Sequence, residues 1–247
     1  MPFRRPAHRK IAEALASMDA ARLYRDGCYF GGGTAIVLQN GEYRQSLDVD
    51  FLCADMDGYR RLRATAVEKG VHGFFGDDAE TVREFRVDQY GLRCVLRWRG
   101  QDIRFEVVRE ARISLEGAVD PELCVPTLSR TDQFAEKLLA NADRCLDRSV
   151  AYRDAIDLGF LVFAGDGAIP NEAIAKAERA YGADIAAKLR AALAALADAG
   201  TIRVAAETLG MELQAAQMAA AALRRAAIAA WPEILFATFP DATGELP

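Results

Sequence analysis

The sequence predicts an α/β (α+β) protein in which a domain that mixes strands and helices, residues 1–125, precedes an all-helical domain, residues 126–247. Segments such as Leu92–Trp98 and Ile103–Val108 alternate apolar and polar residues with the period of strands. Beyond Cys124-Val-Pro126 the apolar residues recur with helical spacing, and the last third is rich in alanine. A content of 51% hydrophobic and 27% charged residues is that of a globular protein.

The expected elements of the first half follow from their patterns. Helices are predicted over residues 8–24 and 33–39, and strands over residues 28–30 and 47–52. Asp57 is a candidate N-cap for a helix over residues 58–69, which Gly70 closes. Strands follow between residues 81 and 108, where Arg99-Gly100-Gln101-Asp102 marks a hairpin, and His72 is placed in a loop.

Two aspartates on one strand form the first candidate site. In Leu47-Asp-Val-Asp-Phe-Leu52 the period of two sends Asp48 and Asp50 to one face and the apolar residues to the other. Their Cα atoms are expected about 7 Å apart from the rise of a strand. Two such carboxylates suit a hard divalent cation, Mg²⁺ or Mn²⁺, better than an apolar core. A surface strand with two solvated aspartates is the simpler alternative.

A run of glycines ahead of the aspartates supplies the other half of a phosphate site. Gly32 and Gly33 allow close backbone approach, and Thr34 opens a helix whose free N–H groups would face an anion. The segment is not a P-loop, because the lysine which that motif needs is missing. A dinucleotide fingerprint fails as well, since Ile36 stands where Gly or Ala is required.

These residues together resemble the nucleotidyltransferase superfamily built like DNA polymerase β, whose motif is Gly-Gly or Gly-Ser, a spacer and Asp-apolar-Asp/Glu. Within it, Gly32-Gly-Thr-Ala35, Arg44-x-Ser46 and Asp48-Val-Asp-Phe51 resemble the AbiEii/AbiGii toxin group. That group is the transferase partner of type IV toxin–antitoxin and abortive-infection systems. The resemblance implies a polymerase β-like nucleotidyltransferase domain with a mixed sheet.

The resemblance also implies a third carboxylate on a strand beside the Asp-x-Asp strand. Glu106 is the first choice for this metal ligand, and Asp102, at the hairpin turn, is the competing one. The alternative role for Glu106 is an exposed ion pair with Arg104 or Arg93 across the hairpin.

A second group of polar residues lies on the helix that starts near Ser129. Its predicted polar stripe consists of Lys137, Asn141, Arg144 and Arg148. With Arg153-Asp-x-x-Asp157 it resembles the second block of the same toxin group. Lys137 suits a point-charge contact to phosphate, and arginine suits a bidentate one. Asp157 would orient Lys137 or accept a proton from the incoming hydroxyl; the alternative is a salt-bridge network that only holds the helices together.

The resemblance implies a metal-dependent enzyme that transfers a nucleoside monophosphate from a nucleoside triphosphate to an acceptor hydroxyl. Asp48, Asp50 and Glu106 would hold the metal. The nucleotide would be bound by Gly32, Gly33, Thr34, Arg44, Ser46, Lys137, Asn141 and Arg144. The implied acceptor is the 3′ end of tRNA, and the implied partner is a cognate antitoxin. Transfer to a small-molecule or protein hydroxyl, and a non-catalytic module that binds nucleotide or a partner, remain alternatives.

Charge and rare residues limit the other functional classes. A net charge of −5 and a pI near 5.3 require any RNA to bind a local basic patch. With two histidines, a Ser-His-Asp triad or a histidine-rich zinc site is disfavoured. The five cysteines show no metal or disulfide spacing, so we predict free thiols and a cytoplasmic location. No apolar run is long enough to predict a membrane span.

Overall fold

The computed structural model describes residues 3–234 and confirms the α/β fold class, with a mixed sheet followed by helices. Contacts divide the chain into two compact units. Unit 1 is Met1–Glu42 with Ser46–Gln133, and unit 2 is Tyr43–Gln45 with Phe134–Pro247. Residues 126–133 thus group with the sheet, because a strand at Pro126–Leu128 pairs with the strand at Cys28–Gly31.

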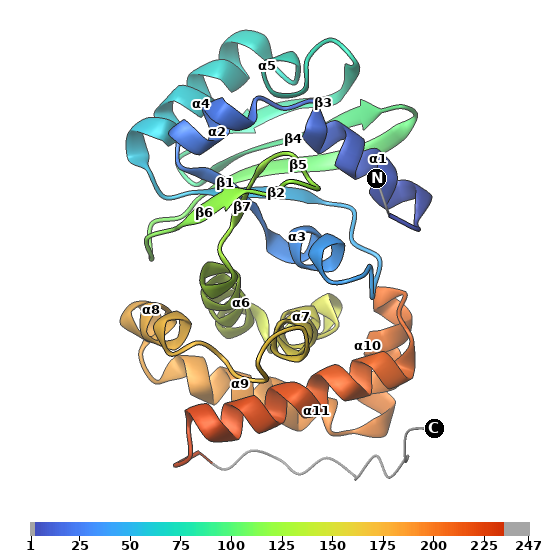
Figure 1. The fold of residues 1–247 in the computed structure, drawn as a ribbon, viewed down its shortest axis with the longest axis vertical. Coiled ribbons are helices and arrows are strands. Elements are labelled where there is room, and N and C mark those ends of the chain that lie inside the picture. The colour runs from blue at the N-terminus through green and yellow to red at the C-terminus, as the bar shows by residue number, and fades with distance from the viewer. Residues whose placement is uncertain (1–2, 235–247) are drawn as a thin grey trace. The chain divides into compact units, whose positions relative to one another are not determined.

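Unit 1 is built on one sheet with the strand order β3-β4-β5-β2-β1-β7-β6 (Figure 1). The strands are β1 (Cys28–Gly31), β2 (Val49–Cys53), β3 (Ala79–Val87), β4 (Gly91–Trp98), β5 (Gln101–Arg109), β6 (Gly117–Val119) and β7 (Pro126–Leu128). The β2–β5 and β1–β7 pairs are parallel and the other pairs are antiparallel, so the sheet is mixed. The predicted hairpin is β4–β5, and its turn has positive φ at Arg99 (46°) and Gly100 (77°).

Helices cover both faces of this sheet. They are α1 (Pro6–Ala16), α2 (Ala20–Arg25), α3 (Gly32–Gln39), α4 (Met56–Lys69) and α5 (His72–Phe75). Helices α2, α4 and α5 lie on one face and α3 on the other (Figure 1). The core contains Phe30, Phe51 and Phe105, whose rings contact one another in sequence at centroid distances of 5.4 and 6.1 Å. Burial of these apolar residues fixes which way each strand faces.

Several local expectations were wrong in detail. The single helix predicted over residues 8–24 is two helices, since Asp19 accepts the Arg22 N–H and starts α2. Helix α4 is capped by Asp55, so Asp57 lies in its first turn instead. His72 opens the short helix α5 rather than a loop. Gly70 ends α4 as predicted, with φ +56°.

Unit 2 is helical. Its helices are α6 (Arg130–Arg144, whose first turn belongs to unit 1), α7 (Arg153–Phe163), α8 (Asn171–Tyr181), α9 (Asp184–Leu196), α10 (Ala199–Leu209) and α11 (Leu213–Ala230). Alanine and glycine allow the helices to approach closely: a Cβ on Gly159 of α7 would lie 2.2 Å from the Ala219 carbonyl oxygen of α11. In the described part of the chain, no helix combines the length and apolar character that crossing a membrane requires.

Candidate functional site

The carboxylates of Asp50 and Glu106 stand side by side on neighbouring strands. In the parallel β2–β5 pair, Asp50 is in register with Glu106, and on β1 the residue opposite Asp50 is Gly31. The flanking residues Val49 and Phe51 are fully buried in the core. Because side chains alternate along a strand, the two carboxylates occupy the opposite face of the sheet. Asp48 immediately precedes β2 and is half-buried.

The sheet register also separates the two candidates for the third carboxylate. The β2–β5 ladder runs from Phe105 to Arg109 on β5, which includes Glu106 and leaves Asp102 outside it. Asp102 instead faces Arg97 across the hairpin and pairs with it at 2.7 Å. Glu106 is therefore the better placed of the two. It forms an ion pair with Arg93, whose Nε lies 2.6 Å from Glu106 Oε1.

The chemistry of these groups fits a divalent metal, although their present arrangement is not that of a closed metal centre. Asp48, Asp50 and Glu106 offer the hard oxygen ligands that Mg²⁺ and Mn²⁺ prefer. Among residues 3–234, however, no three His, Cys, Asp or Glu side chains are grouped closely enough to hold a metal ion. The Glu106–Arg93 pair would have to open, or share Glu106, for this carboxylate to become a ligand.

The glycine run brings the start of α3 against the Asp50 carboxylate. Gly32 adopts φ +67°, and a Cβ at this position would lie 2.7 Å from Asp50 Oδ2, so a side chain here would be strained and crowded. Two residues on, Thr34 is buried, and its Oγ1 lies 2.8 Å from Ser46 Oγ. The first-turn N–H groups of α3, the Thr34–Ser46 hydroxyl pair and Asp50 are thus local to one another within unit 1.

The second predicted group forms a buried ion cluster in unit 2. Asp157 accepts hydrogen bonds from Tyr43 Oη (2.7 Å) and from Arg44 Nε and NH2 (both 2.8 Å), and it pairs with Lys137 Nζ at 2.7 Å. Lys137 Nζ also lies 2.9 Å from Asp154 Oδ1. Asp157 is fully buried, and Arg44 and Lys137 are 3% and 4% exposed.

Charge pairing sets the ionisation of this cluster. Burial alone would raise the pKa of Asp157, but Arg44 and Lys137 hold it below the usual value. The pKa of Asp154 is likewise lowered, because Lys137 and the bidentate Arg144 (2.6 and 2.8 Å) outweigh burial. Burial raises the pKa of Tyr43 well above 10, so the phenol stays protonated and donates. Both aspartates are therefore charged at neutral pH.

Two members of the predicted polar stripe of α6, Lys137 and Asn141, are buried. Arg148 is outside this helix, which ends at Arg144, and lies in a 3₁₀ turn over Arg148–Val150. Asn141, one turn after Lys137, is 2% exposed, and its Nδ2 has no hydrogen-bond partner in the described structure. Buried amide donors are rarely left unpaired, so this one requires an explanation.

Some residues of these two groups gave no signal in the sequence. Tyr43 stacks on Phe160 with ring centroids 3.6 Å apart, yet it stands in a loop where no periodicity predicts a packed ring. Glu42 is 6% exposed and contacts the buried His8, a pairing that joins residues far apart in the chain. Such long-range pairs are invisible to local patterns.

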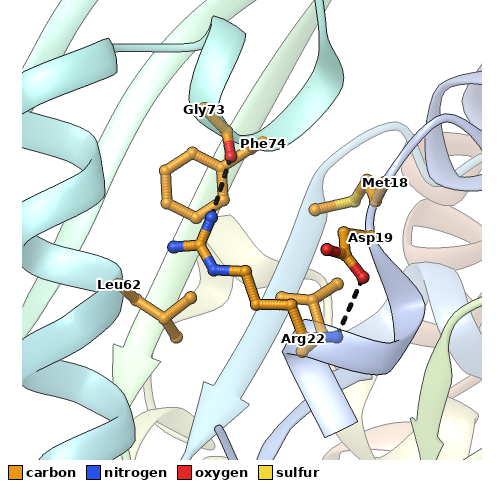
Figure 2. A pocket seen from close by; sticks show the side chains of 7 residues that line it. Met18, Asp19, Arg22, Leu62, Gly73 and Phe74 are labelled. Atoms are coloured by element: carbon orange, nitrogen blue, oxygen red, sulfur yellow. Dashed lines mark hydrogen bonds between the residues drawn. The ribbon is translucent and has the colours of Figure 1, made fainter. Parts of the chain in front are cut away.

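Two hollows in unit 1 lie apart from the Asp50–Glu106 row. One has a volume near 10 Å³, about the room that a single water molecule needs, and is lined by residues that include Met18, Asp19, Arg22, Leu62, Gly73 and Phe74 (Figure 2). The Arg22 guanidinium crosses it and donates to the Gly73 carbonyl at 3.2 Å. The other, about 430 Å³, is open and lies beside β6, β7 and Gln39, the last residue of α3.

Comparisons with known proteins identify the family and the fold of the chain. Residues 13–235 match the family model described as "Nucleotidyl transferase AbiEii toxin, Type IV TA system". The fold is similar to a crystal structure from H. pylori assigned as a nucleotidyltransferase, with TM-score 0.56, 17% identity, and coverage of 92% of this chain and 96% of that one. It is also similar to JHP933 from Helicobacter pylori, with TM-score 0.55, 18% identity, and coverage of 92% and 93%. No curated protein matches the chain in sequence.

Proposed function

The chain belongs to the AbiEii family of nucleotidyltransferases, and we propose that it transfers a nucleoside monophosphate from a nucleoside triphosphate to the 3′ end of a tRNA. In this proposal it is the toxin of a type IV toxin–antitoxin pair, and a cognate antitoxin relieves its effect. The observation that carries the catalytic part is the register of Asp50 with Glu106 beside the start of α3. Carboxylates and free helix N–H groups in one place suit the two ends of a metal-bound triphosphate.

Asp48, Asp50 and Glu106 are the residues proposed to hold Mg²⁺ or Mn²⁺. When bound, the metal would neutralise phosphate charge and lower the barrier to attack on the α-phosphorus. Arg93 already neutralises Glu106 at 2.6 Å, so Glu106 adds little to the repulsion among these carboxylates before the metal binds.

The start of α3 is the proposed cradle for the β- and γ-phosphates. Gly32 and Gly33 leave the backbone accessible, and the first N–H groups of the eight-residue α3 have no partner within the helix. In the Thr34–Ser46 pair one hydroxyl donates to the other. Because Thr34 is 1% exposed and Ser46 is more accessible, we assign the outward O–H to Ser46.

The ion cluster of unit 2 is proposed to bind phosphate as well as to hold its helices. The cluster carries a net charge of +1, which favours an anion. It consists of three cations, Arg44, Lys137 and Arg144, and two anions, Asp154 and Asp157. The unpaired amide of Asn141 is a further donor for the nucleotide. Arg44 already donates to Asp157 and to the Gln45 carbonyl, so its contribution is to fix Asp157, and Asp157 in turn orients Lys137.

An RNA acceptor is supported by the arginines that continue the carboxylate row. Across the sheet, Glu106 of β5 faces Arg93 of β4, which faces Arg86 of β3. In the next row, the register brings Arg83 and Arg104 to either side of Val95. Arg83, Arg86 and Arg104 are exposed. This local basic strip is what an acidic protein needs to bind a polyanionic acceptor.

The test is incubation of the purified protein with each α-labelled nucleoside triphosphate, Mg²⁺, and either total cellular RNA or total protein. We expect label in small RNA, abolished by Asp50→Asn. Arg86→Gln with Arg104→Gln should weaken transfer to RNA and leave nucleotide affinity unchanged. Arg60→Gln is the matched control, because Arg60 is an exposed arginine on α4, paired with Asp57. Label in protein or in small molecules would replace the RNA acceptor, and no label with any acceptor would refute catalysis.

A further inference from the structure

A buried histidine of unit 1 contacts the segment that carries Ser46. His8 lies near the start of α1 and is fully buried. Its Nδ1 is 2.9 Å from Glu42 Oε1, and the Ser46 backbone N–H donates to its Nε2 at 3.4 Å. The ring therefore connects Glu42, three residues after the end of α3, to the segment that leads into β2.

These contacts fix the tautomer of the ring. A carboxylate only accepts, so Nδ1 carries the proton, and a backbone N–H only donates, so Nε2 carries the lone pair. Burial lowers the pKa of His8, which keeps the ring neutral as this pattern requires. Burial would raise the pKa of Glu42, but the backbone N–H groups of Arg4 (2.6 Å) and Arg5 (3.0 Å) hold it below its usual value.

The backbone at Glu42 adopts a conformation that needs support from its surroundings. Glu42 has φ 59°, in the left-handed region, directly after Gly41 at 78°. For a residue other than glycine this conformation costs on the order of 1 kcal/mol or more and persists only where the surroundings enforce it. Here the Glu42 N–H donates to the Val37 carbonyl of α3 at 2.9 Å. The Glu42 carboxylate accepts hydrogen bonds from the His8 ring and from the backbone N–H groups of Arg4 and Arg5.

We propose that His8 is a positioning residue for nucleotide binding. Its Nε2 holds the Ser46 main chain where Ser46 Oγ meets Thr34 Oγ1 at 2.8 Å and directs its own hydroxyl to phosphate. This role rests on the proposed function of Thr34 and Ser46. A histidine with a packing role alone would need its contact to Glu42 and would have no influence on Ser46.

The substitutions His8→Asn and Ser46→Ala test whether His8 acts through Ser46. His8→Asn places an amide N–H near the position of Nδ1 and keeps the bond to Glu42, but it removes the acceptor of the Ser46 N–H. We expect the KM for the nucleotide to rise about three- to tenfold, the usual effect of losing one neutral hydrogen bond, with kcat within about twofold. Ser46→Ala should have a similar effect. The double variant should be no worse than the poorer single one, because both changes remove the same hydroxyl contact.

His72→Asn is the matched control, since His72 is the other histidine and is exposed on α5. It should leave both constants unchanged. Additive effects of His8→Asn and Ser46→Ala, or an unchanged KM in His8→Asn, would overturn the role of His8 while transfer by the wild-type protein still stands. Absence of nucleotide binding by the wild-type protein would overturn this role together with the proposed function.

A second measurement uses the wild-type protein and does not require that His8→Asn folds. With two histidines in the chain, ¹⁵N-imidazole NMR of the wild-type protein resolves each ring, and His72→Asn assigns them. We expect the Nδ1–H tautomer for His8 and a shift of its Nε2 resonance on addition of nucleotide. An Nε2–H tautomer would overturn the proposal, because that nitrogen could not then accept the Ser46 N–H.

Discussion

Replacing Lys137 by methionine removes the ammonium that contacts both buried aspartates of unit 2 and keeps most of the side chain's volume. Lys137 is 4% exposed and lies 2.9 Å from Asp154 and 2.7 Å from Asp157. Breaking a buried pair generally costs about 3–5 kcal/mol, since a charge is left uncompensated. Here Asp154 keeps the bidentate Arg144 and Asp157 keeps Arg44. We therefore expect a smaller loss than this range, about 2 kcal/mol, or a melting temperature about 4–8 °C lower.

The same substitution should weaken nucleotide binding. A charge-assisted contact to phosphate contributes about 1.5–3 kcal/mol, so the Kd should rise about 10- to 150-fold. Lys176→Met is the matched control, because Lys176 is a buried lysine of α8 outside the proposed site. It should leave the Kd unchanged.

The assay uses the distribution of tryptophans over the two units. Trp98 lies in unit 1 and Trp231 in unit 2, so Trp98→Phe makes fluorescence report unit 2 alone. Urea unfolding in this background gives the stability change, and nucleotide titration gives the affinity. Lower stability with unchanged affinity would make Lys137 a structural residue and remove it from the site. Unchanged stability would refute the ion pairs.

Three further predictions follow from the described side chains. Asp48→Asn or Asp50→Asn should abolish metal-dependent transfer, and retained transfer would remove that aspartate from the mechanism. For Asp48→Asn the melting temperature should be equal or higher, because removing this carboxylate relieves its repulsion with Asp50. Because the pKa values of Asp154 and Asp157 are lowered in the folded protein, their ionised forms stabilise the fold above about pH 4. The free energy of unfolding should therefore fall as the pH drops below the unfolded-state pKa near 3.9. Urea unfolding at pH 3–7 measures this, and a free energy that does not change with pH would contradict it. Among the five cysteines, all of which lie in the described part of the chain, Cys124 alone is exposed. A thiol reagent should therefore modify one thiol in the native protein and five in denaturant. Rapid modification of a second thiol in the native protein would refute the burial of the other four.

The first half of the chain was predictable wherever burial follows a short period. Val49 and Phe51 alternate with Asp50, and the apolar core enforces that alternation in the structure. The Gly70 helix end and the Arg99–Gly100 turn were predictable for a similar reason, because their backbone conformations restrict the choice of residue.

What escaped prediction depends on contacts between distant residues. The spacing on α6 predicted a polar stripe but not its burial, and Lys137 is buried because Asp154 and Asp157 on α7 neutralise its charge. The Glu106–Arg93 pair was foreseen only as an alternative, since sequence alone could not rank it against a metal-bound Glu106. The N-cap of α4 was also predicted wrongly, because it is Asp55 and not Asp57. N-cap preferences alone do not distinguish between two aspartates so close together.

The three residues Tyr43–Gln45 have a consequence for how the protein matures on the ribosome. Tyr43 and Arg44 are made early, but their carboxylate partner Asp157 emerges more than a hundred residues later. Until then the guanidinium that becomes buried and the phenol that becomes partly buried remain in water, and the loop between α3 and β2 is incompletely anchored. Since closing so long a loop is slow compared with local helix formation, the sheet of unit 1 should form first and the loop should dock afterwards. A nascent chain released before residue 157 would lack this anchor altogether.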